Sequence, residues 1–529
     1  SAAVDSPTFD AEYRYVLNHT PGEYAVPTLV TFSEAAGFEA LSALGGESLR
    51  TTTTPRPAAY TTLTAADARA AAEIPTAESF TFSPGANPFW RLDYYPAGVF
   101  PEATRSTGYI DYEENRRGLR HLESEHPDRL RTYTNGRSKG HLNYASDRDD
   151  AFPILFAELA ADVRDRAAFA EKEKLVFTIS LHGDERAGVE AGSRFIENVL
   201  RGQEPAVESL LEEFAFVFVY ANPDGWKTRQ PQYESYGVPG ATLFERGQGA
   251  GEDTNRQYAN AGWIFEGFYP AEPNGRDLAA DDPDGIDRDV PPGIRETVPD
   301  ALWIVETLRE YDDVGYFADL HGQSVGADTF VYGLTCQDQF DQGRFQDVQR
   351  WNRTVGEEVT AVADEWRTAA EARESTVGSS VFGVPETAFA WGTIWDTLGY
   401  TGTGRLREWA QLPEESGGLG AVAQNFEMAY SNIASGNVFD PQRVDAQVRA
   451  YRAVYRRTIE HAATDVETGR RSRSGERTPT PTPTSSPSTP GRGASCWPPP
   501  SFGTRAARRR GATTPARPGR PTVGCRRGT

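Results

Sequence analysis

The sequence predicts an α/β fold built on a largely parallel sheet, and three observations carry that prediction. Short apolar runs alternate with segments of helical periodicity between residues 106 and 465. Such alternation is typical of sheets whose parallel strands are buried on both faces. Polar residues, including two histidines, directly follow several of these runs. Because ligands of such sheets lie beyond the carboxyl ends of the strands, we expect a functional site at that edge.

The elements of this region follow in a regular order. A helix at 112–126 ends before Pro127, because proline cannot continue it. A strand is expected at 129–133, and Asn-Gly favours a turn at 135–138. The segments expected beyond residue 150 are a mixed segment at 152–165, a strand at 175–181, helices at 187–201 and 204–213, a strand at 214–220, a helix at 297–311, a strand at 314–320, a helix at 343–371, a strand at 421–428 and a helix at 441–461.

The two ends of the chain differ from this central region. Residues 1–105 hold short mixed segments between Thr-, Ala- and Pro-rich stretches, which indicates an N-terminal arm or a small β-containing domain. Residues 466–529 are rich in Pro, Thr and Arg, so we expect a disordered tail. Its Thr/Pro stalk resembles those of haloarchaeal surface proteins without their apolar anchor. A polyanion-binding tail, an end without a binding role and a change of reading frame are the alternatives.

The amino-acid composition argues against several classes of protein. The formal charge is −22, and four lysines stand against 50 arginines. An acidic, lysine-poor surface indicates adaptation to high salt and argues against nucleic acid as the main partner. Three cysteines make neither a disulfide framework nor a cysteine zinc site. No apolar run approaches the ~20 residues of a membrane helix. The first residue is Ser1, which fits a removed export signal or a trimmed chain, and we expect an extracellular or cell-surface protein.

Two of the seven histidines stand in matched positions. His182 ends the run VFTISLHG and His321 ends YFADLHG, and a glycine follows each. Glu185 lies three residues after His182, so one short loop can aim both side chains at one metal ion. Two imidazoles and a carboxylate suit zinc with a fourth position open for water, although other divalent ions could substitute. His-x-x-Glu alone is equally compatible with a surface turn.

Five short motifs occur in a fixed order: HGDE at 182–185, NPDG at 222–225, GEDTNRQY at 251–258, DLHG at 319–322 and FEM at 426–428. In this order and at this approximate spacing they resemble the zinc metallocarboxypeptidases of the carboxypeptidase A type. The resemblance covers about residues 106–460. It implies an α/β/α sandwich on a mixed, roughly eight-stranded, largely parallel sheet, with one zinc ion at the strand ends.

The resemblance assigns roles around the metal residue by residue. It makes His182, Glu185 and His321 the zinc ligands, and it makes Asp253 the acid that orients the first histidine. Asp319 shares a strand face with His321, and we expect its role to be structural.

The same resemblance assigns the residues of the reaction. Glu427 matches the general base that activates the zinc-bound water, with Glu408 as its rival. Asn255 and Arg256 match the pair that grips the terminal carboxylate, and a guanidinium fork suits a carboxylate. Tyr400 matches a mobile tyrosine that closes over the substrate, because GYTGTG supplies a flexible loop.

Two arginines remain to be placed. Arg246 is the preferred residue for stabilising the oxyanion, and Arg229 is the alternative. Arg407 precedes Glu408-Trp409, which resembles the acidic-Trp pair of the family, and so falls near the position that senses the terminal side chain. An arginine there would favour acidic C-terminal residues.

The sequence therefore predicts an exported, salt-adapted zinc carboxypeptidase. Its partners would be peptide or protein C-termini, with neither nucleic acid nor stable membrane insertion. A zinc-dependent deacylase of small N-acyl amino acids shares the same ligand triad and is the nearest alternative. A non-catalytic metal-binding surface protein is the other.

Overall fold

A computed structural model of the chain describes residues 4–44, 47–143, 148–227, 244–249, 253–258, 298–323, 328–336, 342–377, 382–399, 404–414, 417–431 and 439–467. All of them belong to the first of two compact units, residues 1–476 and 477–529. Beyond the end of its last helix, the predicted tail lies outside the described residues, as do Tyr400 and Arg229. The domain boundaries proposed from the sequence stay predictions.

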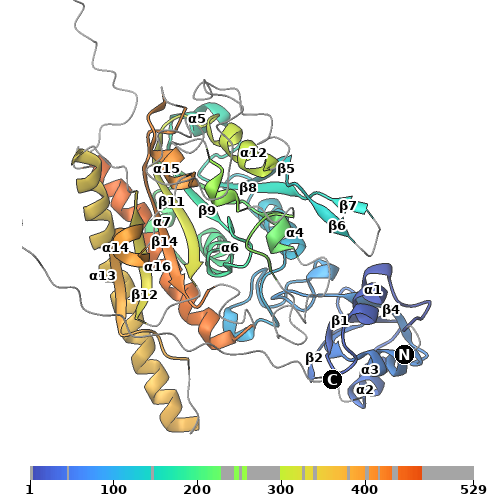
Figure 1. The fold of residues 1–529 in the computed structure, drawn as a ribbon. Helices are drawn as coiled ribbons and strands as arrows, with labels where there is room; N and C mark the ends of the chain where they lie inside the picture. Colours follow the sequence, from blue (N-terminus) through green and yellow to red (C-terminus); the bar gives the residue numbers. More distant parts are fainter. Residues whose placement is uncertain are drawn as a thin grey trace, which may run out of the picture. The chain divides into compact units, whose positions relative to one another are not determined.

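An eight-stranded mixed sheet organises the central region (Figure 1). Its strands in spatial order are β13 (Thr387–Thr393), β12 (Thr329–Thr335), β14 (Val422–Ala429), β11 (Val314–Gln323), β9 (Glu173–Ile179), β10 (Phe214–Tyr220), β8 (Pro153–Leu159) and β5 (Leu130–Arg137). The four central strands, β14, β11, β9 and β10, are parallel to one another. β12 and β8 run antiparallel to their inner neighbours. The predicted α/β fold with a mixed, largely parallel sheet is confirmed.

Helices cover both faces of this sheet, because its strands alternate apolar side chains between them. In β9, Leu175 and Phe177 pack into one hydrophobic cluster while Val176 packs into another. The first cluster includes α4 (Tyr112–Glu125), α6 (Ala187–Leu200), α13 (Gln342–Val377) and α16 (Pro441–Glu467). The second includes α5 (Arg166–Glu171), α12 (Pro299–Leu308) and α15 (Leu406–Gln411). No helix in the described ranges has the length and apolar character that crossing a bilayer requires.

Two local predictions were wrong, and two strands were not predicted. The turn expected at 135–138 lies inside β5, where Gly136 has φ +68° and the pairing with β8 shifts register. Asn-Gly therefore marks a bulge rather than a hairpin turn. The helix expected at 204–213 is reduced to α7 (Pro205–Glu208). Strands β12 and β13 were not predicted, because each interrupts its apolar residues with a glycine.

The N-terminal segment contains a second, four-stranded antiparallel sheet. Its strands in spatial order are β2 (Glu47–Thr52), β3 (Ala58–Leu63), β1 (Val26–Phe32) and β4 (Ala77–Phe82). Helices α1 (Ala11–His19), α2 (Gly37–Ser42) and α3 (Ala65–Ala72) contribute to a hydrophobic cluster that the sheet shares. Tyr13, Val30 and Phe80 are fully buried in it. The segment thus has an apolar core of its own.

Candidate metal centre and active site

The predicted site lies where the order of the parallel strands reverses. The chain places β10 on one side of β9 and then β11 on its other side. The loops that leave such a pair diverge and open a crevice at the carboxyl ends of the strands. His182 follows β9, and His321 lies near the end of β11. Glu427 stands on the next strand, β14, in direct register with His321.

The three predicted metal ligands converge. Nδ1 of His182 lies 2.8 Å from Oε1 of Glu185 and 3.1 Å from Nδ1 of His321. Oε2 of Glu185 lies 2.8 Å from Nδ1 of His321. All three side chains are buried, and this trio is a metal-compatible cluster of His, Cys, Asp and Glu within the described ranges.

The geometry and chemistry of this cluster fit zinc. With bonds of about 2.0–2.1 Å, a tetrahedral zinc ion separates its ligand atoms by about 3.3 Å. The observed separations of 2.8–3.1 Å need to open by only a few tenths of an ångström. Burial opposes a charge on Glu185, but the two imidazoles lower the pKa of its carboxyl below the usual range. A buried carboxylate between two nitrogen donors is a setting that favours a cation.

The second nitrogen of each histidine is held by another carboxylate. Nε2 of His182 lies 3.0 Å from Asp253, and Nε2 of His321 lies 2.7 Å from Asp319. Each carboxylate accepts a hydrogen bond from the Nε2–H group, so that Nδ1 is left to face the metal. Asp253 thus has the contact predicted for it. Asp319, which we expected to be structural, contacts the ligand His321 directly, a contact that the sequence analysis did not predict.

Two glycines allow the loop that carries His182 and Glu185 to pack closely against a neighbouring loop. A Cβ atom on Gly183 would overlap the backbone of Gly225, which belongs to NPDG in α8 (Pro223–Trp226). The amide of Asn222 donates to the carbonyl oxygens of Leu181 and Arg246 at 3.3 and 3.1 Å. NPDG therefore joins the loop of His182 to the loop that carries Arg246.

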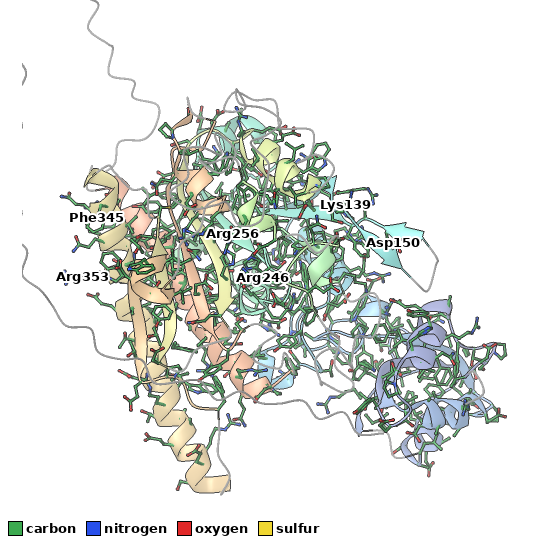
Figure 2. All side chains as sticks on the ribbon, in the orientation of Figure 1. Lys139, Asp150, Arg246, Arg256, Phe345 and Arg353 are labelled. Atoms are coloured by element: carbon green, nitrogen blue, oxygen red, sulfur yellow. The ribbon has the colours of Figure 1, made fainter. Side chains whose placement is uncertain are left out.

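Arg246 bridges carboxylates that surround the metal site. Its Nη1 donates to Glu185 at 3.1 Å, and its Nε and Nη2 donate to Oδ2 of Asp253 at 3.2 and 3.1 Å. Burial lowers the pKa of Arg246, but Glu185 and Asp253 outweigh it and raise the pKa above its usual value. The residue is half-exposed and lines the same cavity as His182. Figure 2 labels its side chain and that of Arg256, which also lines this cavity.

This cavity, of about 420 Å³, brings together the residues predicted for the reaction. Glu427, Asn255, Arg256 and Arg407 all line it. Glu427 is 8% exposed, and its Oε1 accepts a hydrogen bond from Asn425 at 2.8 Å. Burial is the main cause that raises the pKa of Glu427 to about 7. A bound cation would lower that value.

The other predicted residues lie in different places, and of those that the structure describes only Arg256 and Asn255 line the cavity. Arg256 is half-buried, and its Nη1 donates to the carbonyl oxygen of Asn255 at 2.7 Å. Asn255 accepts a hydrogen bond from the N–H of Leu406 at 3.1 Å. Glu408, the rival for the base, pairs with Arg405 at 2.6 Å and belongs to α15. Tyr400 and the alternative Arg229 lie outside the described residues.

Sequence reasoning missed part of the cavity wall. Tyr332 comes from β12, and Ile394 and Leu398 come from α14 (Ile394–Leu398). The run TFVYGLT at 329–335 carried a usable signal, because it is apolar and rich in β-branched and aromatic residues. Thr393 and Asp396 form a capping box at the start of α14, which marks a helix start in the sequence.

The fold and the ligand set define a zinc-dependent hydrolase of the α/β/α type. The sequence model of the zinc carboxypeptidases matches residues 116–429, which is more than half of the chain. The chain belongs to the zinc carboxypeptidase family. It is a metallocarboxypeptidase with a single zinc at His182, Glu185 and His321. Among the alternatives weighed from the sequence, family membership favours the peptidase over the deacylase and the non-catalytic protein.

Solved structures of carboxypeptidases are similar to this chain at low identity. One is a putative carboxypeptidase A from Shewanella denitrificans, with 16% identity, 67% of this chain and 70% of that chain covered, and a TM-score of 0.38. Another is the carboxypeptidase A of Helicoverpa armigera, with 13% identity, coverage of 84% and 99%, and a TM-score of 0.42. A third is a metallo-carboxypeptidase from Pseudomonas aeruginosa, with 14% identity, coverage of 83% and 82%, and a TM-score of 0.36. A search of curated proteins found no match. The family assignment rests on the sequence model.

Proposed function

We propose that the enzyme removes single residues from the C-termini of peptides and proteins, with Glu427 as general base and Arg256 as the group that binds the terminal carboxylate. One observation supports these roles of Glu427 and Arg256 most directly. Glu427, Arg246 and Arg256 line one cavity together with the metal ligands His182 and Glu185. A base, two cations and a metal site are what hydrolysis of a terminal peptide bond requires.

Glu427 is suited to move the protons of the reaction. It stands beside His321 on the neighbouring strand, and Asn425 fixes one of its oxygens. In this proposal the carboxylate takes a proton from the attacking water and later delivers it to the leaving amine. Zinc, when bound, supplies a Lewis acid that polarises the scissile carbonyl and lowers the pKa of water.

Arg256 and Asn255 are suited to recognise the end of the substrate. The bond from Arg256 to the Asn255 carbonyl engages Nη1 and holds the guanidinium in place. A guanidinium has five N–H donors, so four remain for a carboxylate. The N–H of Leu406 fixes the Asn255 amide at the cavity wall.

We assign to Arg246 the role of stabilising the negative charge that develops on the oxygen of the scissile carbonyl. Three of its five N–H groups hold Glu185 and Asp253, which leaves two for the reaction. Its positive charge would be fixed before the reaction begins. Tyr400 keeps its proposed role as a closing residue on sequence grounds alone.

The test compares one peptide in two forms, with a free C-terminal carboxylate and with a C-terminal amide. The zinc-loaded enzyme should release the last residue of the free acid and leave the amide intact. Replacing Arg256 with Met should reduce kcat/KM for the free acid at least tenfold while zinc content stays unchanged. Equal cleavage of both forms, or cleavage at internal bonds, would contradict the proposal.

We also propose that the enzyme acts outside the cell in a medium of high salt. The formal charge of −22 and the scarcity of lysine support this proposal. Thermal unfolding between 0.1 and 3 M KCl tests the salt dependence, with Tm expected to rise, because screening reduces repulsion among carboxylates. A Tm that falls over this range would contradict it. Detection of the protein in the culture medium or on the cell surface tests the location.

A further inference from the structure

The first turn of α6 is capped by a residue from a distant segment of the chain. The first N–H groups of a helix have no partner within it, and the side chain of the N-cap residue usually accepts one of them. Arg186 is the N-cap of α6, and an arginine side chain has no acceptor to offer. Ser431 accepts instead. Its carbonyl oxygen accepts from the N–H of Arg186 at 3.2 Å, and its Oγ accepts from the N–H of Ala187 at 3.0 Å.

Ser431 continues the strand that carries Glu427, and it is buried. β14 ends at Ala429, and Tyr430 then adopts φ +55°, in the left-handed region. A bulky residue rarely adopts this conformation, because its Cβ atom crowds the backbone. Such backbone strain persists only where surrounding contacts hold the chain in place. The two bonds from α6 to Ser431 are contacts of this kind, so the turn after β14 and the start of α6 fix each other.

Ser431 also contacts β11, the strand of the third metal ligand. Its N–H donates to the carbonyl oxygen of Gln323, the last residue of β11, at 3.3 Å. Gly322 lies so close that a Cβ atom on it would come within 2.7 Å of the Ser431 carbonyl oxygen. The N–H of Gly322 in turn donates to Oε2 of Glu185 at 2.8 Å. The segments that carry the metal ligands and the base therefore meet at Ser431.

We infer that Ser431 is a positioning residue, which fixes the separation between the general base Glu427 and the metal ligand Glu185. This inference rests on the proposed role of Glu427. Ser431 lies four residues after Glu427, and Arg186, which it caps, directly follows Glu185. A displacement at Ser431 therefore reaches both groups over a short length of chain. A misplacement of about 1 Å between reacting groups can reduce the rate about 100-fold.

The main test is the substitution Ser431→Ala in the zinc-loaded full chain. It removes the Oγ acceptor and keeps the main-chain bonds of Ser431. With a peptide that has a free C-terminal carboxylate, kcat should fall about tenfold or more. KM should stay within about threefold, because Arg256 and Asn255, which bind the terminal carboxylate in the proposed function, belong to a different segment, η3 (Thr254–Arg256). At saturating zinc the variant should keep one zinc per chain.

Two further variants separate positioning from a general loss of stability. Ser431→Thr keeps a hydroxyl acceptor, so its kcat should stay within about threefold of the wild-type value. Thr64→Ala removes another helix cap, because the Thr64 side chain accepts a hydrogen bond from the N–H of Asp67 at the start of α3. This control should lower Tm and leave kcat unchanged. A decrease in kcat that Ser431→Ala shows and both other variants lack is specific to the hydroxyl of Ser431.

The outcomes distinguish this inference from the proposed function. If the wild type cleaves the peptide and the folded, zinc-loaded Ser431→Ala variant has the same kcat, the inference is overturned and the proposed function stands. A Ser431→Thr variant as impaired as Ser431→Ala also overturns it. A zinc-loaded wild type that releases no residue overturns both. If Ser431→Ala does not fold, Ser431→Cys replaces it with the same expected result, because a thiol is only a weak acceptor.

Discussion

Asp319 provides the sharpest test of how the protein holds its metal. Its Oδ2 lies 2.7 Å from Nε2 of His321, and its Oδ1 accepts a hydrogen bond from Thr178 at 2.5 Å. The substitution Asp319→Asn keeps the shape of the side chain and removes the charge. The amide oxygen can still accept from His321, and the NH2 group can donate to the Thr178 hydroxyl. The hydrogen bonds are therefore retained, and the variant isolates the effect of the charge.

The expected magnitude follows from the general cost of losing such a partner. Mutating the group that orients a metal ligand weakens metal affinity about 10- to 100-fold, or about 1.4–2.8 kcal/mol. Because the hydrogen bonds survive here, we expect the lower limit, a zinc Kd about tenfold higher. Asp319→Ala, which removes the bonds as well, should approach the upper limit. Chelator competition on the metal-free protein measures both.

A matched control comes from α16, whose Asp465 is hydrogen-bonded to a residue of the same strand, β11. Asp465 is fully buried, and it accepts a hydrogen bond from Tyr316 of β11 at 2.6 Å without contacting a metal ligand. Asp465→Asn should leave the zinc Kd unchanged. The reasoning is refuted if Asp319→Asn binds zinc as tightly as the wild type, or if both variants lose affinity equally.

Three further predictions follow from the geometry. Gly183→Ala forces a Cβ into the Gly225 backbone and should lower Tm and zinc content, whereas Gly22→Ala, in open space, should change neither. Glu427→Gln should keep one zinc per chain and lose at least 100-fold in kcat, and a smaller loss would exclude Glu427 as the base. Burial raises the pKa of Asp300 in α12 to about 7. A raised carboxyl pKa means that wild-type stability falls as pH rises from about 4 to 7, by about 1.4 kcal/mol per unit. Asp300→Asn should therefore raise Tm more at pH 8 than at pH 5, and a pH-independent difference would contradict this.

The metal ligands and Glu427 could be predicted from the sequence, because few residue types can bind zinc or act as a general base. Two histidines at the carboxyl ends of apolar runs, and one glutamate three residues after the first of them, form a pattern that parallel topology brings together. The register of β11 and β14 then places Glu427 beside His321. Strand ends, residue type and spacing are local properties of the sequence, so this part of the site could be read from it.

The cavity wall depended on tertiary structure and was less predictable. The role of Asp319 depends on the orientation of His321, which spacing alone does not specify. The pairing of Glu408 with Arg405, which removes Glu408 as a rival for the base, likewise depends on how α15 packs. The failed turn at Asn135-Gly136 has a similar origin, because pairing with β8 converts a local turn signal into a bulge.

The most direct test of the central claim is an anomalous difference map at the zinc edge from crystals of the zinc-loaded enzyme. We expect one peak per chain, about 2.0–2.1 Å from Nδ1 of His182, Nδ1 of His321 and a carboxylate oxygen of Glu185. Both Nε2 atoms should remain hydrogen-bonded to Asp253 and Asp319. A peak elsewhere, or one bound through either Nε2 atom, would contradict the account.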